Sequence, residues 1–192
     1  MTTEPEASGR AFLGLVRHIK EKYGEPALRT VVENAALPTR TVFASTIRVF
    51  NWYPYESFSG FLSSAVRNVG GGDLNYARNL GAAAGQRDLS TIFRVYVALA
   101  SAERLIRSCE TIWPSYYRNA GRMVAVTWQP TNTTLRIEDF PRMHPAHCKL
   151  MEGWMATTMD TIGFRVSSNA RETTCVGRGG PYHEFSCTWD RK

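Results

Sequence analysis

The sequence predicts an α+β fold in which a helical N-terminal half packs on an antiparallel sheet of β-β-α-β-β order. Two observations carry this prediction. Apolar residues recur at intervals of three and four, the spacing of a helix face, up to Pro114, and short alternating stretches typical of strands dominate after it. The length of 192 residues and the 43% hydrophobic content fit a single domain with its own core, which we expect to span residues 1–192.

The first residues, 1–10, are polar, and we expect them to form a disordered tail. A helix is predicted over 11–23, because its apolar residues share one face. Gly24 ends this helix, and Pro26 can occupy the first position of a second one. The segment 41–52 is ambiguous, since its β-branched residues favour a strand while its apolar spacing also fits a helix.

Three further helices are expected before the sheet. Residues 55–69 carry a clear helical face, and three glycines then break the chain before Asp73, a favourable N-cap residue. A short helix over 74–84 should follow. The strongest periodicity covers 89–113, which predicts a long core helix capped by Asp88.

The last third alternates between strand and helix patterns. Residues 122–128 and 133–138 should pair across a Pro-Thr-Asn turn. An amphipathic helix is predicted over 147–162, where Gly follows its end. The stretches 164–174 and 182–189 should form a second pair of strands around a glycine-rich turn.

Composition limits the classes of function. The N-terminus lacks the pattern of a secretion signal, and no apolar stretch reaches the length of a membrane helix, so we expect a cytoplasmic protein with reduced thiols and no membrane partner. The formal charge is +6, but the basic residues are scattered, which favours a solvated surface over a nucleic-acid partner.

The cysteines of the last third indicate a metal site. The set Cys148, Glu172, Cys175 and Cys187 has the spacing C-x23-E-x2-C-x11-C. A hairpin centred near residue 181 would place Cys175 opposite Cys187, close enough for two thiolates to share a zinc ion. Cys148 would open the helix on this sheet, where the helix dipole favours a thiolate. The remaining cysteine, Cys109, fits the apolar face of a core helix.

Spacing alone leaves alternatives to this zinc site. Cys175 and Cys187 could form a disulfide, or the thiols could be buried separately. A histidine could also replace Glu172 as a ligand. The candidates are His144, His147 and His183.

Three segments carry a resemblance to a known family: HCKLMEGWMATTMDTIGF, ETTCVGRGG and YHEFSCTW. Together they resemble the C-terminal part of the 4-vinyl reductase-type domain, in which a helix with a cysteine and a glycine precedes E-x-x-C and a last strand with C-x-aromatic. This family belongs to one superfamily with H-NOX domains, TRAPP subunits and the sensor domains of phenol-responsive transcription activators.

The resemblance implies a zinc ligand set. In the phenol sensors the ligands are a cysteine at the head of the helix, both residues of E-x-x-C and the final cysteine. Their counterparts here are Cys148, Glu172, Cys175 and Cys187, although the interval before Cys187 is longer than in those sensors. The heme-binding members of the superfamily need a histidine on a central helix. Residues 73–117 contain none, so the resemblance does not imply heme here.

Aromatic residues suggest a ligand pocket between the helices and the sheet, where the phenol sensors have theirs. The alternative is that these side chains simply fill the core. The expected lining residues are Phe58, Phe61, Tyr96, Trp113, Trp128 and Trp154.

We therefore expect a sensor-like binding module rather than an enzyme. It would hold a small apolar or aromatic molecule above a sheet stabilised by structural zinc. The superfamily implies a homodimer, and a further protein partner would transmit the output. The alternatives are an enzyme that acts on a pigment or polyketide-like substrate, and a dimeric scaffold without a ligand.

Overall fold

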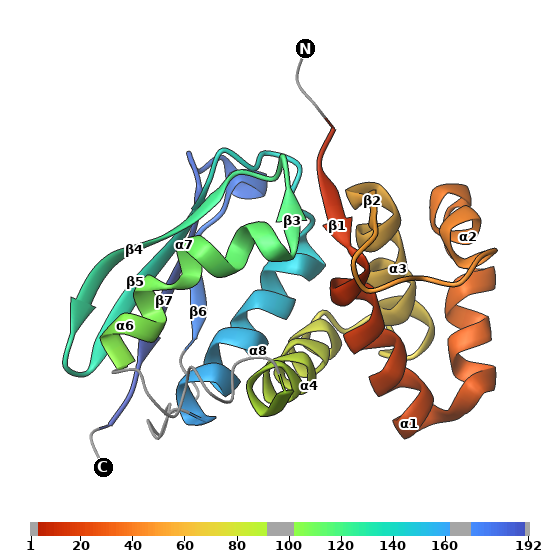
Figure 1. The fold of residues 1–192 in the computed structure, drawn as a ribbon, viewed down its shortest axis with the longest axis horizontal. Helices are drawn as coiled ribbons and strands as arrows, with labels where there is room; N and C mark the ends of the chain where they lie inside the picture. The colour runs from red at the N-terminus through yellow and green to blue at the C-terminus, as the bar shows by residue number, and fades with distance from the viewer. Residues whose placement is uncertain (1–3, 92–101, 162–169, 191–192) are drawn as a thin grey trace.

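The computed structural model describes residues 4–91, 102–161 and 170–190, and it has the expected α+β architecture. The N-terminal helices occupy one side of the molecule and the four-stranded sheet occupies the other (Figure 1). Helices α4 (Asn75–Thr91) and α8 (Pro145–Thr161) lie between them. None of the helices in the described segments is both long and apolar enough to cross a membrane.

The first helices follow the predicted breaks. Helix α1 (Gly9–Glu33) is kinked at Gly24, whose φ of 84° lies in the left-handed region, and Pro26 follows the kink. Helix α3 (Tyr55–Asn68) confirms the helix expected over 55–69.

The ambiguous segment 41–52 is mostly neither helix nor strand. Helix α2 (Leu37–Phe43) ends near its beginning, and strand β2 (Trp52–Pro54) starts at its last residue. Its mixed pattern therefore reflects a connection between two short elements.

The predicted N-terminal tail is wrong for the described residues. Strand β1 (Glu6–Ser8) is the central strand of a small sheet, between β2 and β3 (Tyr117–Arg118). Its two partners come from distant parts of the chain, so the strand has no local pattern that could reveal it. This sheet holds the start of α1 beside strand β3, which comes late in the helical half of the chain.

The region after α3 also differs from the prediction. Helix α4 continues without a break through Asp88, which is therefore not an N-cap. Helix α6 (Ala102–Arg107) and helix α7 (Cys109–Ile112) are separated at Ser108, so the C-terminal part of the expected long helix is interrupted. Residues 92–101 lie outside the described part of the chain.

The four-stranded sheet confirms the predicted β-β-α-β-β order. Its strands are β4 (Arg122–Gln129), β5 (Asn132–Glu138), β6 (Arg171–Thr174) and β7 (His183–Thr188). They are antiparallel and lie in the spatial order β4-β5-β7-β6.

Two glycines set the distance between α4 and α8. A Cβ atom on Gly153 would lie 1.8 Å from the carbonyl oxygen of Arg78, and one on Gly81 would lie 1.9 Å from that of Leu150. The two backbones are therefore in direct contact, which only glycine permits at these positions. This contact fixes α8 relative to the N-terminal helices, and with it the side chains that α8 supplies to both sites described below.

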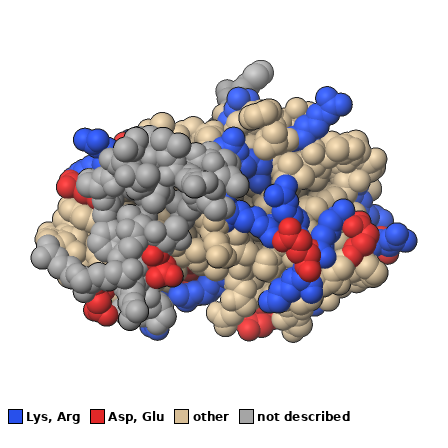
Figure 2. Space-filling model, turned by 60° about the horizontal axis from the view of Figure 1, so that its bottom comes forward, with Lys and Arg blue, Asp and Glu red and all other residues tan. Residues whose placement is uncertain are grey.

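Charged side chains of both signs are interspersed on the face shown in Figure 2. Elsewhere in the described residues, charged side chains pair directly, as Lys20 does with Glu25 at 2.8 Å and Arg87 does with Glu21. The visible residues of this face form no extended surface of a single sign.

Candidate metal centre and ligand cavity

Four side chains that suit a metal ion meet where α8 packs on the sheet. Cys148 lies in the first turn of α8, Glu172 is on β6, Cys175 follows β6, and His183 begins β7. One donor atom from each lies within 4.8 Å of the others. We call these four residues the metal cluster.

The spacing of the donor atoms is close to that of a zinc site. The Cys148 Sγ is 3.4 Å from the His183 Nδ1, which is 3.1 Å from the Glu172 Oε1. In a tetrahedral site with bonds of about 2.0–2.3 Å, the ligand atoms lie about 3.3–3.8 Å apart. Small side-chain shifts would therefore bring these atoms to bonding distance from one ion.

The orientation of His183 is set by its second ring nitrogen. Its Nε2 lies 3.3 Å from the carbonyl oxygen of Phe140, which can only accept, so Nε2 carries the proton. In the neutral ring, Nδ1 then directs a lone pair at the Glu172 carboxylate, which is also an acceptor. Two acceptors at this distance need a proton or a cation between them. A histidine that binds a metal with one nitrogen and donates to a backbone carbonyl with the other has this arrangement.

The electrostatics of the cluster favour a carboxylate at Glu172. Burial raises the pKa of Glu172, but the polar side chains of His183, Cys148 and Cys175 and the nearby charge of Arg178 outweigh burial and lower it overall. The Arg178 guanidinium lies 3.2 Å from the Glu172 Oε2. Burial and the neighbouring carboxylate raise the pKa of the Cys148 thiol, so without a cation this thiol stays protonated.

A buried carboxylate holds the cluster against α8. Glu152 is 1% exposed, and its Oε1 accepts a hydrogen bond of 3.0 Å from the backbone N–H of Glu172. Lys149 neutralises it at 2.8 Å. The strand that carries Glu172 is thus tied to α8 by a charge-assisted hydrogen bond.

The structure brings together three of the four predicted ligands and places Cys187 elsewhere. Cys187 lies opposite Thr133 on β5 and is fully buried. Burial and the charge of Glu152 raise the pKa of its thiol to about 12. His183 occupies the remaining place in the cluster, where it joins Glu172 instead of replacing it. All four cysteines are free thiols, so the alternative disulfide is absent.

Cys187 lies outside the cluster because the register of the hairpin differs from the expected one. Thr174 lies opposite Glu184, so the next step of the register brings Cys175 level with His183 and not with Cys187. A 3₁₀ turn (Val176–Arg178) and Gly179, with φ of 85°, move the centre of the hairpin toward β6. The amides of Arg178 and Gly180 both donate to the Cys175 carbonyl, at 3.0 and 2.9 Å, which closes the turn around the cysteine.

A cavity of about 50 Å³ lies between the N-terminal helices, α7 and α8. Phe58, Trp113 and Trp154 line it, as expected. Phe61 instead stacks on Phe43 at 4.9 Å within the helical core, and Trp128 packs against Trp189 at 5.4 Å beside the sheet. Tyr96 lies outside the described residues.

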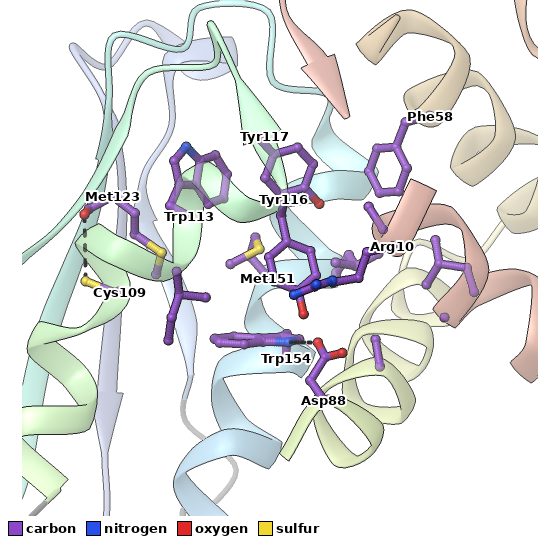
Figure 3. Close-up of a pocket in the computed structure, with 16 residues that line it drawn as sticks. Arg10, Phe58, Asp88, Cys109, Trp113, Tyr116, Tyr117, Met123, Met151 and Trp154 are labelled. Carbon is purple, nitrogen blue, oxygen red and sulfur yellow. Dashed lines mark hydrogen bonds between the residues drawn. The ribbon is translucent and has the colours of Figure 1, made fainter. Parts of the chain in front are cut away.

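Sequence reasoning missed the polar residues of the cavity. Arg10, Asp88 and Tyr116 come from α1, α4 and the segment before β3, and they converge on one side of it together with Trp154 (Figure 3). The sequence predicts a tail at Arg10 and a helix cap at Asp88. Only long-range packing brings them together, so no local pattern could have found them.

A buried histidine lies between the cavity and the metal cluster. His147 precedes Cys148 and packs against three side chains that also line the cavity: Phe58, Trp113 and Tyr117. Its Nδ1 is 2.9 Å from the Tyr55 hydroxyl, while its Nε2 is buried without a hydrogen-bond partner among the described residues. Burial, with smaller effects from His183 and His144, lowers the pKa of His147 to about 3. It is therefore neutral and contributes to the packing around both sites.

The cavity does not fit a histidine-bound heme. None of its described lining residues is a histidine. The thiol among its described lining residues is Cys109, whose Sγ lies 3.7 Å from the Met123 carbonyl oxygen. Burial and the neighbouring Glu110 raise the pKa of this thiol to about 12, so it is a neutral thiol.

Comparisons with known proteins place the fold. No protein-family model matches the chain. No curated protein matches it either. Several solved structures, however, match the chain in fold. An Fe(II) H-NOX protein from S. oneidensis matches with a TM-score of 0.74 and 11% identity, covering 96% of this chain and 97% of that one.

Two further structures agree. The Fe(II) unliganded H-NOX protein from K. algicida has a TM-score of 0.70 at 12% identity, covering 96% of this chain and 97% of that one. An oxygen-binding H-NOX domain related to soluble guanylate cyclases has a TM-score of 0.67 at 11% identity, with 96% and 95% covered. The fold is H-NOX-like. At these identities the likeness concerns the fold alone.

Proposed function

We propose that this chain is a sensor-like module that binds a small apolar or aromatic molecule, and that a structural zinc ion supports its binding cavity. The zinc ligands would be Cys148, Glu172, Cys175 and His183, with His183 in the place first assigned to Cys187. The observation that carries the proposal is the gathering of four suitable donor atoms within 4.8 Å of one another, with the His183 Nδ1 only 3.1 Å from the Glu172 Oε1.

The donor set favours zinc over other common ions. Thiolate and imidazole ligands suit zinc, whereas magnesium and calcium prefer oxygen ligands alone. Two thiolates, one carboxylate and a divalent ion leave a net charge of −1, which Arg178 offsets beside the Glu172 Oε2. Four protein ligands leave no open coordination position, so the ion would act structurally, by joining the first turn of α8 to β6 and β7.

The fold and the cavity support the ligand-binding part of the proposal. The cavity is lined by side chains from both halves of the chain, so its occupancy can change how α1, α4 and α8 pack. The E-x-x-C segment supports kinship with the 4-vinyl reductase-type domains. The output through a homodimer or a protein partner belongs to the same proposal.

Metal content tests the zinc site. Purified wild-type protein and Cys187→Ser protein should each hold one zinc per chain after gel filtration in a chelator, because Cys187 is outside the cluster. Cys148→Ser and Cys175→Ser should lose it. Cobalt substitution gives a second readout, since the sulfur-to-cobalt charge-transfer absorption reports two thiolate ligands here and three in the alternative set with Cys187.

Two results would overturn the assignment. Folded wild-type protein without zinc would refute the site itself. Loss of zinc in Cys187→Ser, together with its retention in a folded His183→Gln variant, would restore the ligand set with Cys187.

A further inference from the structure

The polar groups of the cavity are gathered in one place. Arg10, Asp88, Tyr116 and Trp154 form what we call the polar corner (Figure 3). The Trp154 Nε1 donates to the Asp88 Oδ2 at 3.0 Å, which holds the carboxylate at the edge of the cavity. The Arg10 guanidinium lies 5.6 Å from the centre of the Tyr116 ring.

The hydroxyl of Tyr116 has unused hydrogen-bonding capacity. It is buried and makes no hydrogen bond with a described group, although it points between Arg10 and Asp88. A buried hydroxyl without a partner costs free energy, and native structures retain few of them. A ligand that enters the cavity can supply the missing partner.

The charges of the polar corner select for a neutral ligand. Asp88 is an acid and Arg10 a base, and no other charged side chain is among the described lining residues. An anionic ligand would meet the Asp88 carboxylate, and a cationic one would meet the Arg10 guanidinium, in a partly desolvated site where like charges repel strongly. A neutral group that both donates and accepts can satisfy all three side chains.

The rest of the cavity is apolar and narrow. Leu15, Phe58, Ile112 and Trp113 also line the cavity, and its volume of about 50 Å³ favours a compact ligand. Two flexible methionines, Met123 and Met151, complete this side and can move to admit a ring.

We propose that the cavity recognises a compact, neutral molecule whose apolar body carries one head group that both donates and accepts hydrogen bonds, such as a primary amide or an alcohol. Asp88 accepts from the head group, while Tyr116 and Arg10 donate to it. This inference rests on the proposed ligand cavity and specifies the chemistry of its ligand.

Four planar molecules of equal size test the inference. Benzamide is neutral and both donates and accepts, acetophenone only accepts, benzoate is an anion and benzamidine is a cation. Titrations of the zinc-loaded protein, followed by NMR, should show that benzamide binds at least about tenfold more tightly than each of the others, a difference of about 1.4 kcal/mol.

A single substitution should weaken the selection against an anionic ligand. Asp88→Asn leaves Arg10 uncompensated, so the ratio of benzoate to benzamide affinity should rise at least about tenfold. Glu103→Gln is the matched control. It removes the same charge from α6, where Glu103 pairs with Arg107 at 2.9 Å and does not line the cavity, so it should leave the ratio unchanged.

The outcomes separate this inference from the proposed function. Equal binding of benzamide, acetophenone and benzoate would leave the proposed cavity intact and overturn the selectivity assigned to the polar corner. An unchanged ratio in a folded Asp88→Asn variant would also overturn it. If none of the four molecules binds, both the inference and the ligand-binding part of the proposed function fail, while the zinc site is judged separately by metal content.

Discussion

Helix α8 supplies side chains to two regions of opposite character. Its first turn contributes Cys148 to the metal cluster, where the donor atoms lie within 4.8 Å of one another and the backbone of β6 is bonded to Glu152. Its middle contributes Met151 and Trp154 to the cavity, where the Tyr116 hydroxyl has no partner. The cluster is built to hold elements together, whereas the cavity retains unused space and polarity.

This difference indicates a division of energetic roles. A bound metal adds its binding free energy to the stability of the fold. A cavity and an unpaired buried hydroxyl both reduce that stability, and such costs are typical of binding sites. Substitutions in the cluster should therefore destabilise the protein, while selected substitutions in the cavity should stabilise it and weaken ligand binding.

The largest effect is expected from loss of the metal. Cys175→Ser should lower the free energy of unfolding by about 3–5 kcal/mol, because it would remove a ligand of the proposed zinc ion and release the hairpin from α8. Chelation of the wild-type protein should produce a loss of the same size. Urea unfolding of both, with and without chelator, measures this.

The control for that experiment is Cys187→Ser. This thiol is also buried but lies outside the cluster. Its replacement should cost less than about 2 kcal/mol, the penalty of burying a hydroxyl in place of a thiol, and should leave the response to chelator intact. A Cys175→Ser variant as stable as the wild type, with no response of either protein to chelator, would contradict the proposed role of the cluster.

The limits of sequence-based prediction follow the same division. The sheet order, α3 and three cluster residues, Cys148, Glu172 and Cys175, could be predicted because their patterns are local or carried by the E-x-x-C resemblance. His183 could not be selected, because a 3₁₀ turn at Val176–Arg178 changes the hairpin register, and a register is set by turn geometry that spacing alone does not fix.

The cavity was predicted less well than the cluster. Aromatic residues on helical faces identified Phe58, Trp113 and Trp154, but the same reasoning included Phe61 and Trp128, which fill other parts of the core. A helical face reveals burial and not which buried side chains border a void. The polar corner depends on contacts between residues far apart in the sequence, such as Arg10 with Tyr116 and Asp88 with Trp154, and these have no local signal.

An intermediate effect is expected from filling the cavity. Gly14 is a cavity-lining residue inside α1, and a Cβ at this position would meet only the Ala84 Cβ, at 3.9 Å. Gly14→Ala should therefore raise the free energy of unfolding by about 0.5–1 kcal/mol through helix propensity, and it should weaken benzamide binding by occupying part of the space. Thermal or urea unfolding and NMR titration measure the two effects.

Gly60→Ala provides the comparison for Gly14→Ala. Gly60 is also inside a helix, α3, but a Cβ there would lie 2.5 Å from the Thr39 Oγ1, which is buried and hydrogen-bonded to the Ser57 carbonyl. The same change should therefore destabilise the protein at this position. If Gly14→Ala were destabilising as well, the space beside Ala84 would not be open.

The smallest effect concerns the dependence of stability on pH, and it follows from the position of Asp88 in the cavity. Burial raises the pKa of this carboxyl in the folded protein, although the hydrogen bond from Trp154, the nearby Tyr116 hydroxyl and the charge of Arg10 act in the opposite direction. Between the ordinary pKa of an aspartate and this raised value, the folded state binds more protons than the unfolded state. The contribution of Asp88 to the wild-type free energy of unfolding must therefore fall as pH rises through that window. Asp88→Asn cannot ionise and can still accept from Trp154, so its stability relative to the wild type should increase from acidic to neutral pH and then level off.

Urea unfolding of both proteins across this range measures the difference, with Glu103→Gln as the charge control. A difference that stays flat or declines with rising pH would show that ionised Asp88 is well solvated or well paired, and the cavity would then carry no electrostatic cost at this position.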